Sequence, residues 1–275
     1  MPELPEVQTV VNDLIAADLV GATINSAKIH WPKTISGQTP RVFGRLIKGR
    51  SITAIWRRAK FIVIDLDEGW HLLIHLRMTG RLVLVPKGHK RHKHEHVILS
   101  LDQQRDLRFF DPRKFGRLYL VENIDRLLGR LGPEPLAQHF TARRLGERLL
   151  SKKRQLKPLL LDQTFLAGLG NIYVDEALWD AGIHPLRISN TLAEMETKRL
   201  HRSIRKVLRR GLNNLGTTLG TGQTTFYSVA RRQGRNRDAL MVFRRNGCPC
   251  PRCGTKIERL LVGQRSTHVC TTCQK

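Results

Sequence analysis

The chain has 275 residues, which is long enough for two compact domains and a small appendage, each with its own core. Its 48 lysines and arginines outnumber 23 acidic residues and leave a net charge of +25, so we expect a polyanionic partner: nucleic acid first, a membrane surface or a ribosomal assembly otherwise. No apolar run approaches the ~18 residues of a membrane span and the acidic N-terminus lacks the features of a signal peptide, which predicts a cytoplasmic protein without a membrane partner.

The N-terminus reads Met1-Pro2-Glu3-Leu4-Pro5-Glu6. Initiator methionine is usually removed before a small residue, which would leave Pro2 as a secondary amine. An α-amino group titrates near ~8, so part of it is unprotonated at neutral pH and can attack an electrophilic carbon. Its adduct with a sugar C1′ would be an iminium that accepts electrons during elimination, and Glu3 could shuttle protons.

A structural interpretation of the same residues is that Pro2 and Pro5 only begin a helix, with acids at its positive end. Taken alone, these residues favour that simpler interpretation. A helix from Pro5 to Val20 is predicted by helical spacing of apolar residues, and Gly21 provides its stop; the apolar residues are Val7, Val10, Val11, Leu14, Ile15 and Leu19. Either way, the helix would hold Pro2 rigidly.

Short strands follow between Ala22 and about Glu122, separated by Gly, Pro, Asp and Asn. Many short strands with one long helix predict an α+β module, a β-sandwich that carries helices. The predicted strands are Ile24–Trp31, Ser51–Trp56, Phe61–Leu66, His71–Leu76, Arg81–Val85, His96–Leu101, Leu107–Phe110 and Leu118–Val121.

Two turns within this region, Leu76–Gly80 and Asp111–Gly116, place Met78, Arg113 and Phe115 where a core role is hard to assign. The ordinary interpretation is turn chemistry, with Phe115 tucked inward. The alternative is a wedge, because an enzyme that acts on a base must extrude it and fill the space left in the stack. Between the turns, residues 87–96 are rich in histidine, but the lysines and arginines among them argue against a metal site.

A Gly-Pro break after a short helix at Ile124–Pro135 predicts a domain boundary, giving domains at 1–135, 136–238 and 239–275. The second domain is expected to be helical. Its predicted helices are Arg143–Leu150, Pro158–Asp162, Ile172–Trp179 and about Leu192–Leu215, with a basic face at Arg202–Arg210.

Glycines at 168 and 170 precede the predicted helix Ile172–Trp179 and would let backbone amides approach a phosphate. Gly216–Asp238 shows little periodicity and predicts a mobile loop.

The last segment contains all five cysteines of the chain. Cys250-x2-Cys253, sixteen residues, and Cys270-x2-Cys273 have the spacing of a four-thiolate zinc ribbon. One structural Zn²⁺ is therefore expected, and because so short a ribbon cannot bury a core, zinc would supply its folding free energy. Cys248 is an extra thiol, but a Cys-x-Cys pair fits poorly into this geometry.

The Met-Pro-Glu-Leu-Pro-Glu-Val start and the four-cysteine ribbon together resemble formamidopyrimidine-DNA glycosylases, and the resemblance spans nearly the whole chain. Residues 164–173, with Lys157 upstream, are similar to the helix-two-turns-helix element of that family. Residues 262–267, which include Arg265, match the hairpin segment that carries the family's phosphate-binding arginine. The resemblance implies an N-terminal β-sandwich, a helix-two-turns-helix domain with a lesion-capping loop, and a zinc ribbon.

The implied function is a bifunctional DNA glycosylase and AP lyase of base excision repair. It would act as a monomer on damaged double-stranded DNA, held between the sandwich and the helical half. It would remove 8-oxoguanine and formamidopyrimidines through a Pro2 Schiff base, followed by β- and δ-elimination. The implied catalytic residues are Pro2, Glu3, Lys60 and Arg265. The implied DNA-binding residues are Met78, His94, Arg113, Phe115, Lys152, Lys157, Asn171 and Tyr173.

Two alternatives remain open. Endonuclease VIII, of the same family, prefers oxidised pyrimidines, but Leu4 stands where that branch typically carries glycine. A zinc-ribbon DNA-binding protein without enzymatic activity would explain the charge and the cysteines, but not the Pro2-Glu3 terminus. Gly216–Asp238 departs from the usual family sequence at its lesion-capping position.

Overall fold

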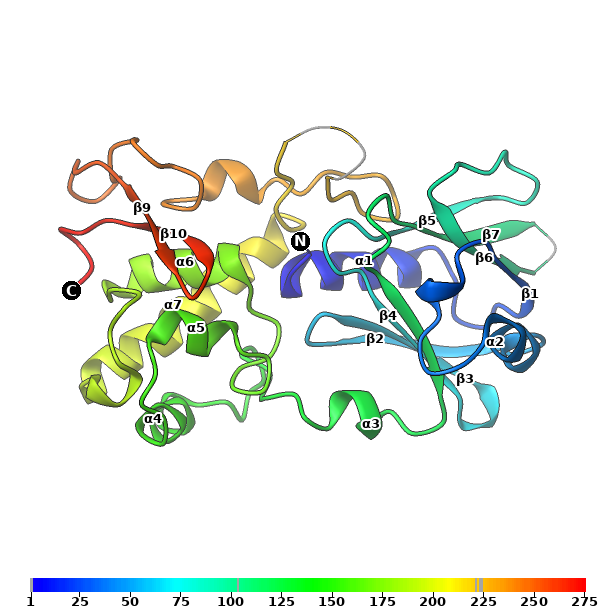
Figure 1. Ribbon diagram of the computed structural model, residues 1–275, viewed down its shortest axis with the longest axis horizontal. Coiled ribbons are helices and arrows are strands. Elements are labelled where there is room, and N and C mark those ends of the chain that lie inside the picture. The colour runs from blue at the N-terminus through cyan, green and yellow to red at the C-terminus, as the bar shows by residue number, and fades with distance from the viewer. Residues whose placement is uncertain (1, 103, 221, 223–224) are drawn as a thin grey trace. The chain divides into compact units, whose positions relative to one another are not determined.

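The computed structural model describes residues 2–102, 104–220, 222 and 225–275 (Figure 1). Met1, whose removal the sequence predicts, lies outside the described residues. The chain divides into two compact units, one formed by Met1–Gly129 with Asn214–Arg237 and the other by Arg130–Asn213 with Asp238–Lys275. The predicted loop is thus grouped with the N-terminal half. None of the described helices has the length and apolar character needed to cross a bilayer.

Helix α1 (Leu4–Ala16) begins the first unit and packs against strands β2 and β3. A reciprocal capping box starts it, because the Glu3 side chain accepts from the backbone of Glu6 and the Glu6 side chain accepts from the backbone of Glu3. The helix ends earlier than predicted, since Ala17 caps it and Asp18 adopts a φ of 52°. Its apolar face, with Val7, Val10, Val11 and Leu14, is fully buried in the core of this unit.

Two four-stranded antiparallel sheets form the predicted β-sandwich. All eight predicted strands are present, and the α+β prediction is confirmed. One sheet has the order β1-β6-β7-β5, formed by Ile24–Ile29, Glu95–Leu101, Arg105–Phe110 and Arg81–Pro86. The other has the order β2-β3-β4-β8, formed by Ile52–Arg58, Phe61–Leu66, His71–His75 and Arg117–Val121. Apolar side chains of both sheets meet α1 in one core.

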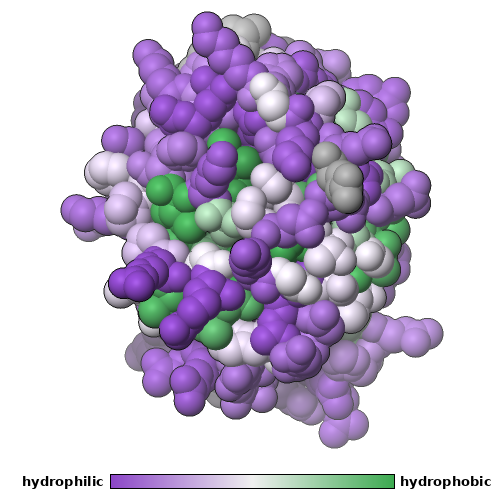
Figure 2. Space-filling view, turned by 90° about the vertical axis from the view of Figure 1, so that its right-hand side faces the viewer, coloured by the Kyte–Doolittle hydropathy of each residue, from purple (hydrophilic) through white to green (hydrophobic). Residues whose placement is uncertain are grey.

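Helix α2 (Pro40–Ile47) lies between predicted strands and is not predicted from the sequence. Pro40 occupies its first turn, the Thr39 side chain caps it, and it packs against β1. On the side of the molecule where β1 and α2 lie in Figure 1, hydrophilic side chains surround a central area of pale and hydrophobic side chains (Figure 2). Helix α3 (Asp125–Leu128) is the short helix expected before the Gly-Pro break.

The second unit contains the predicted helices α4 (Ala142–Leu150), α5 (Leu156–Leu161), α6 (Asn171–Ala181) and α7 (Glu194–Asn213). Helices α6 and α7 approach closely where Gly211 faces Tyr173: a Cβ built at Gly211 would lie 2.5 Å from the tyrosine hydroxyl oxygen. The chain ends in the antiparallel hairpin of β9 (Glu258–Val262) and β10 (Arg265–Val269). A small buried cluster supports this ribbon and consists of Trp179, Val242, Cys250, Ile257 and Cys270.

Candidate functional site

Pro2 and Glu3 lie at the start of α1, and both are buried. Glu6, one turn further along, fixes them through a carboxylate that accepts two backbone N–H groups. Oε2 accepts from Glu3 at 2.8 Å, and Oε1 accepts from Thr217 at 2.6 Å. Gly216 makes the second contact possible, since a Cβ built there would lie 2.8 Å from Glu6 Cγ. Glu6 therefore joins the predicted nucleophile to the first residues of the predicted capping loop.

Lys60 lies in the tight turn between β2 and β3 and is 6% exposed. Ala59, beside it, adopts a φ of 53°, and the Ala59 carbonyl accepts from the Arg57 guanidinium at 2.9 Å. Across the sheet, the His75 ring meets Phe61 edge-on with centroids 4.7 Å apart. Burial, helped by the charges of Arg77 and Lys60, lowers the pKa of His75 to about 3. The ring is thus neutral at physiological pH, and its Nδ1 accepts the Arg77 N–H at 3.0 Å.

The two predicted wedge turns present their apolar side chains to solvent: Met78 is 42% exposed and Phe115 is 45% exposed. The Arg113 guanidinium lies over the Phe115 ring, 4.8 Å from its centroid. The exposure of Phe115 disagrees with the interpretation in which it is tucked inward. It is compatible with a wedge.

Asp111 holds the two turns together. Its carboxylate is fully buried and accepts from the Thr79 hydroxyl of one turn and from the backbone N–H groups of Gly116 (2.7 Å) and Arg113 (3.2 Å) in the other. This role of Asp111 is not visible in the sequence, because it depends on a contact with Thr79, 32 positions away. The predicted DNA contact His94 lies nearby, with its ring 5.7 Å from that of Phe110.

In the second unit, the predicted DNA contacts Lys157 and Asn171 both hydrogen-bond to the hairpin of the ribbon. Lys157 is fully buried, and its Nζ donates to Asp175 at 2.6 Å and to the Ser266 carbonyl at 2.9 Å. Asn171 Nδ2 donates to the same carbonyl at 2.9 Å. Both side chains therefore hold the backbone next to Arg265, which is exposed at the start of β10.

Tyr173 and Lys152 differ in exposure. Tyr173 is 1% exposed and packs against Gly211, whereas Lys152 is exposed between α4 and α5.

Within the basic face of α7, two arginines make structural contacts. Arg205 donates to the Pro135 and Ala137 carbonyls at 2.9 and 3.0 Å, and Arg210 pairs with the buried Glu176 at 2.9 Å.

Cys250, Cys253, Cys270 and Cys273 bring their four sulfur atoms within 4.8 Å of one another. Tetrahedral zinc with Zn–S bonds of ~2.3 Å separates its sulfurs by about 3.8 Å, so the group fits this metal. The observed Cys250–Cys273 and Cys253–Cys270 distances are 3.9 and 3.5 Å. Trp179 Nε1–H donates to Cys250 Sγ at 3.4 Å, a contact that would favour the thiolate. Cys248 is exposed and is not part of the group.

Three family models match successive parts of the chain. They are the formamidopyrimidine-DNA glycosylase N-terminal domain at residues 1–118, the H2TH domain of the same glycosylase at residues 131–223, and the zinc finger found in FPG and IleRS at residues 247–275. The formamidopyrimidine-DNA glycosylase of Protochlamydia amoebophila is 46% identical over 275 residues, and that of Herpetosiphon aurantiacus is 46% identical over 277 residues. Both matches cover the whole of each chain.

Solved structures of this family have the same fold. A Lactococcus lactis FPG mutant in complex with a Fapy-dG-containing DNA superposes with a TM-score of 0.91 at 34% identity, covering 100% of both chains. The Lactococcus lactis Fpg with an abasic-site-containing DNA gives 0.91 at 34% identity over 99% of both chains. The MutM (Fpg) protein from Thermus thermophilus gives 0.89 at 38% identity, over 99% of this chain and 98% of the other.

Proposed function

Because the chain belongs to the formamidopyrimidine-DNA glycosylase family, we propose the residues by which it works and the lesions that it removes. It is a bifunctional DNA glycosylase and lyase of base excision repair, it binds damaged DNA, and four of its five cysteines hold one structural zinc. Four thiolates leave no open position for activating water, so zinc stabilises the ribbon and has no part in the chemistry.

The catalytic proposal rests on one observation, the way Glu3 and Glu6 fix the start of α1. After removal of Met1, the lone pair of the Pro2 nitrogen forms a bond to C1′. The C1′–base bond breaks, and its electrons leave with the base, which takes up a proton. Glu3, buried beside Pro2, is the group placed to transfer protons. The Pro2 nitrogen then loses its proton and the C1′–O4′ bond breaks as O4′ takes up a proton, which yields an iminium on the ring-opened sugar.

The iminium then drives elimination of both phosphates. Loss of a C2′ proton allows the 3′ phosphate to leave, and a second elimination releases the 5′ phosphate, which leaves a gap with a phosphate at each end. We propose that Lys60 contacts the DNA and assists these steps, and that Arg265 grips phosphates around the lesion. Lys60 is held in a tight turn and Arg265 in a hairpin, which suits positioned cations.

Some of the proposed DNA-binding residues contact the DNA, and others position a residue that does. We propose that Met78, Arg113 and Phe115 fill the space left by the extruded base, and that His94 and Lys152 contact the backbone. Lys157 and Asn171 act as positioning residues for Arg265 through the Ser266 carbonyl, and Tyr173 supports them by packing α6 on α7. Such a scheme needs one copy of the chain, so we propose a monomer that works in the cytoplasm, where a bacterial chromosome lies.

The lesions proposed are 8-oxoguanine and formamidopyrimidines, in keeping with Leu4 and with the relatives named above. One experiment tests both chemistry and preference: duplexes carrying either these purines or oxidised pyrimidines are incubated with the protein and borohydride. We expect a covalent protein–DNA adduct and efficient excision of the purines. A non-enzymatic DNA-binding protein would give no adduct, and an endonuclease VIII-like enzyme would prefer the pyrimidines.

A matched variant locates the nucleophile. A retained N-terminal extension converts the Pro2 amine to an amide, and we expect it to abolish the adduct while DNA binding persists. Cys248→Ser, which leaves the N-terminus free, should form the adduct at the wild-type rate. Adduct formation by the extended protein would place the nucleophile elsewhere.

A further inference from the structure

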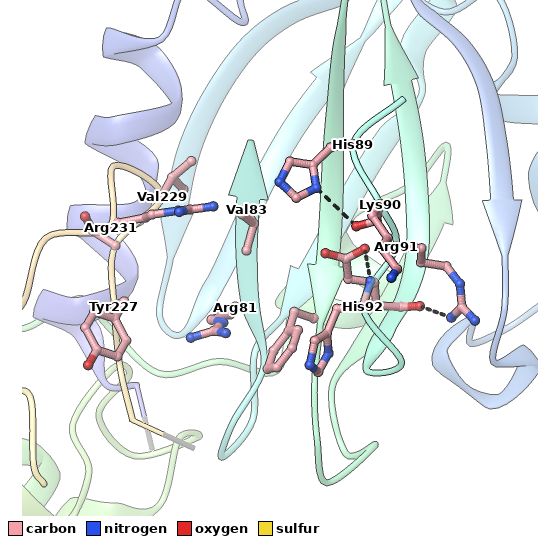
Figure 3. Close-up of a pocket in the computed structure, with 12 residues that line it drawn as sticks. Arg81, Val83, His89, Lys90, Arg91, His92, Tyr227, Val229 and Arg231 are labelled. Carbon is pink, nitrogen blue, oxygen red and sulfur yellow. Dashed lines mark hydrogen bonds between the residues drawn. The ribbon is translucent and has the colours of Figure 1, made fainter. Parts of the chain in front are cut away.

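A cavity of about 620 Å³ lies within the first unit, and part of the predicted capping loop lines it (Figure 3). Three segments line it: strand β5 with the end of β7, the connection from β5 to β6, and the last part of the loop that follows α7. The side chain of Arg81, from β5, and those of Tyr227 and Arg231, from the loop after α7, surround the same space in Figure 3. The cavity size is typical of a small-molecule site, ~300–1,000 Å³.

Arg81 is the central cation of this cavity. Its guanidinium lies 4.0 Å from the centroid of the Phe110 ring and 6.0 Å from that of Tyr227. Its Nε is buried without a hydrogen-bond partner, and Arg81 makes no ion pair in the described part of the chain. A guanidinium stacked on an aromatic face presents its N–H groups in one plane, in the geometry that binds a phosphate or carboxylate through two hydrogen bonds.

The charges around Arg81 are mostly positive. Arg231, Lys90 and His89 are exposed on the cavity wall, and His92 is half-buried there. The lining carboxylate, Glu95, is already engaged, because it accepts from Arg108 Nη1 at 2.9 Å and from the His92 N–H at 3.1 Å. Burial lowers the pKa of Arg81, with Arg231 acting in the same direction, yet arginine stays charged at neutral pH. The cavity therefore has one buried unsatisfied donor, Arg81 Nε, and an excess of positive charge.

We propose that this cavity is a nucleotide-phosphate site, in which Arg81 and Arg231 bind the phosphate and Tyr227 contacts the attached sugar or base. A phosphate accounts for the unpaired guanidinium, and the aromatic wall and the volume account for a group larger than phosphate alone. The Phe110 ring that supports Arg81 also contacts His94, the proposed backbone contact. The inference rests on the proposed function in that the DNA strand beside the lesion is the expected source of the phosphate; a free nucleotide is the other source.

The test compares DNA binding across a series of salt concentrations for wild type, Arg81→Gln and Arg231→Gln. Each phosphate contact contributes about 0.9 to the slope of log Kobs against log salt, so each variant should lower the slope by about 1. Arg45→Gln is the matched control, because Arg45 is an exposed arginine of α2, which packs on β1 at the opposite edge of the sheet from β5. Titration of each protein with deoxyguanosine monophosphate tests the second source.

A lower slope in both cavity variants, but not in Arg45→Gln, supports the site with DNA as its ligand. An unchanged slope with at least tenfold weaker nucleotide binding supports the site with a free nucleotide. If neither measurement separates the cavity variants from Arg45→Gln, the proposal is wrong. Should Arg81→Gln fold poorly, the exposed Arg231→Gln decides. Failure of the proposed function is a different result, the absence of a borohydride adduct in the wild-type protein.

Discussion

The start of α1 and the zinc ribbon both carry a proposed catalytic residue, but they are stabilised differently. Pro2 and Glu3 begin a helix whose side chains Val7, Val10, Val11 and Leu14 are buried in the core of the β-sandwich. Arg265 belongs to a hairpin supported by only a small buried cluster, two members of which are cysteines. The first site is therefore held by hydrophobic burial, and the second depends on a metal.

The two regions share one feature, a buried carboxylate that fixes the backbone beside the functional residue. Glu6 accepts from Glu3 and Thr217, and Asp175 accepts from the His268 N–H at 2.9 Å while it pairs with Lys157. In a chain of net charge +25, burial of acids in structural roles leaves the cations to dominate the surface. The buried acids are Glu3, Glu6, Asp13, Glu95, Asp106, Asp111, Asp175 and Glu176.

The largest effect on stability is expected from loss of the metal. Cys253→Ser should remove zinc and unfold the ribbon, because zinc contributes ~10–16 kcal/mol to the folding of such small domains. The sandwich should keep its structure. Zinc content and circular dichroism measure the two parts separately, and DNA binding should be lost with the metal. Cys248→Ser is the control and should retain one zinc. A stoichiometric metal in Cys253→Ser would contradict the ligand assignment.

The next effect concerns the carboxylate under the ribbon. Asp175→Asn leaves the fully buried Lys157 without its counter-charge, and breaking a buried pair in this way costs about 3–5 kcal/mol. Denaturant unfolding measures the loss. Glu147→Gln, which removes the acid of an exposed pair with Arg143, should show no comparable change. If Asp175→Asn is as stable as this control, the ribbon does not depend on the buried pair.

In the first unit, Glu6→Gln should reduce the free energy of unfolding less than Asp175→Asn does, and its main effect should be on activity. The amide cannot accept from both backbone N–H groups, so about 1–3 kcal/mol is lost through an unsatisfied donor. Because the sandwich core remains, we expect the main consequence at Pro2, a drop of at least tenfold in the rate of borohydride trapping. Exposed Glu122→Gln controls for the charge. Equal trapping rates in the two variants would show that Glu6 has no part in positioning.

These carboxylates also mark the limit of prediction from sequence. The four zinc ligands and the eight strands follow from local spacing and were predicted correctly. Glu6 was visible as half of a capping box, but its bond to Thr217 joins residues 211 positions apart. The Asp111 contact with Thr79 and the Asp175 contact with His268 are likewise set by tertiary packing. Helix α2 was missed because its short amphipathic pattern lies among strands.

The smallest effect on stability is expected from Phe115→Ala, and this prediction separates a wedge from a core residue. A buried phenylalanine costs about 3–5 kcal/mol when truncated, but Phe115 is 45% exposed and its ring contacts the Arg113 guanidinium. We expect a change in unfolding free energy below about 1 kcal/mol, close to that of Val20→Ala, which truncates a side chain 48% exposed in the same unit.

Phe115→Ala and Val20→Ala should differ in the rate of base excision, although their stabilities are similar. Extruding a base costs a few kcal/mol of stacking and pairing, and a wedge offsets that cost by occupying the vacated space. Phe115→Ala should therefore excise a damaged base much more slowly than Val20→Ala. A preformed abasic site contains no base to extrude, so its cleavage should be affected far less. If Phe115→Ala slows both reactions equally, or lowers the melting temperature sharply, then Phe115 is a structural residue. The two turns tied together by Asp111 would in that case support the sandwich rather than open the DNA.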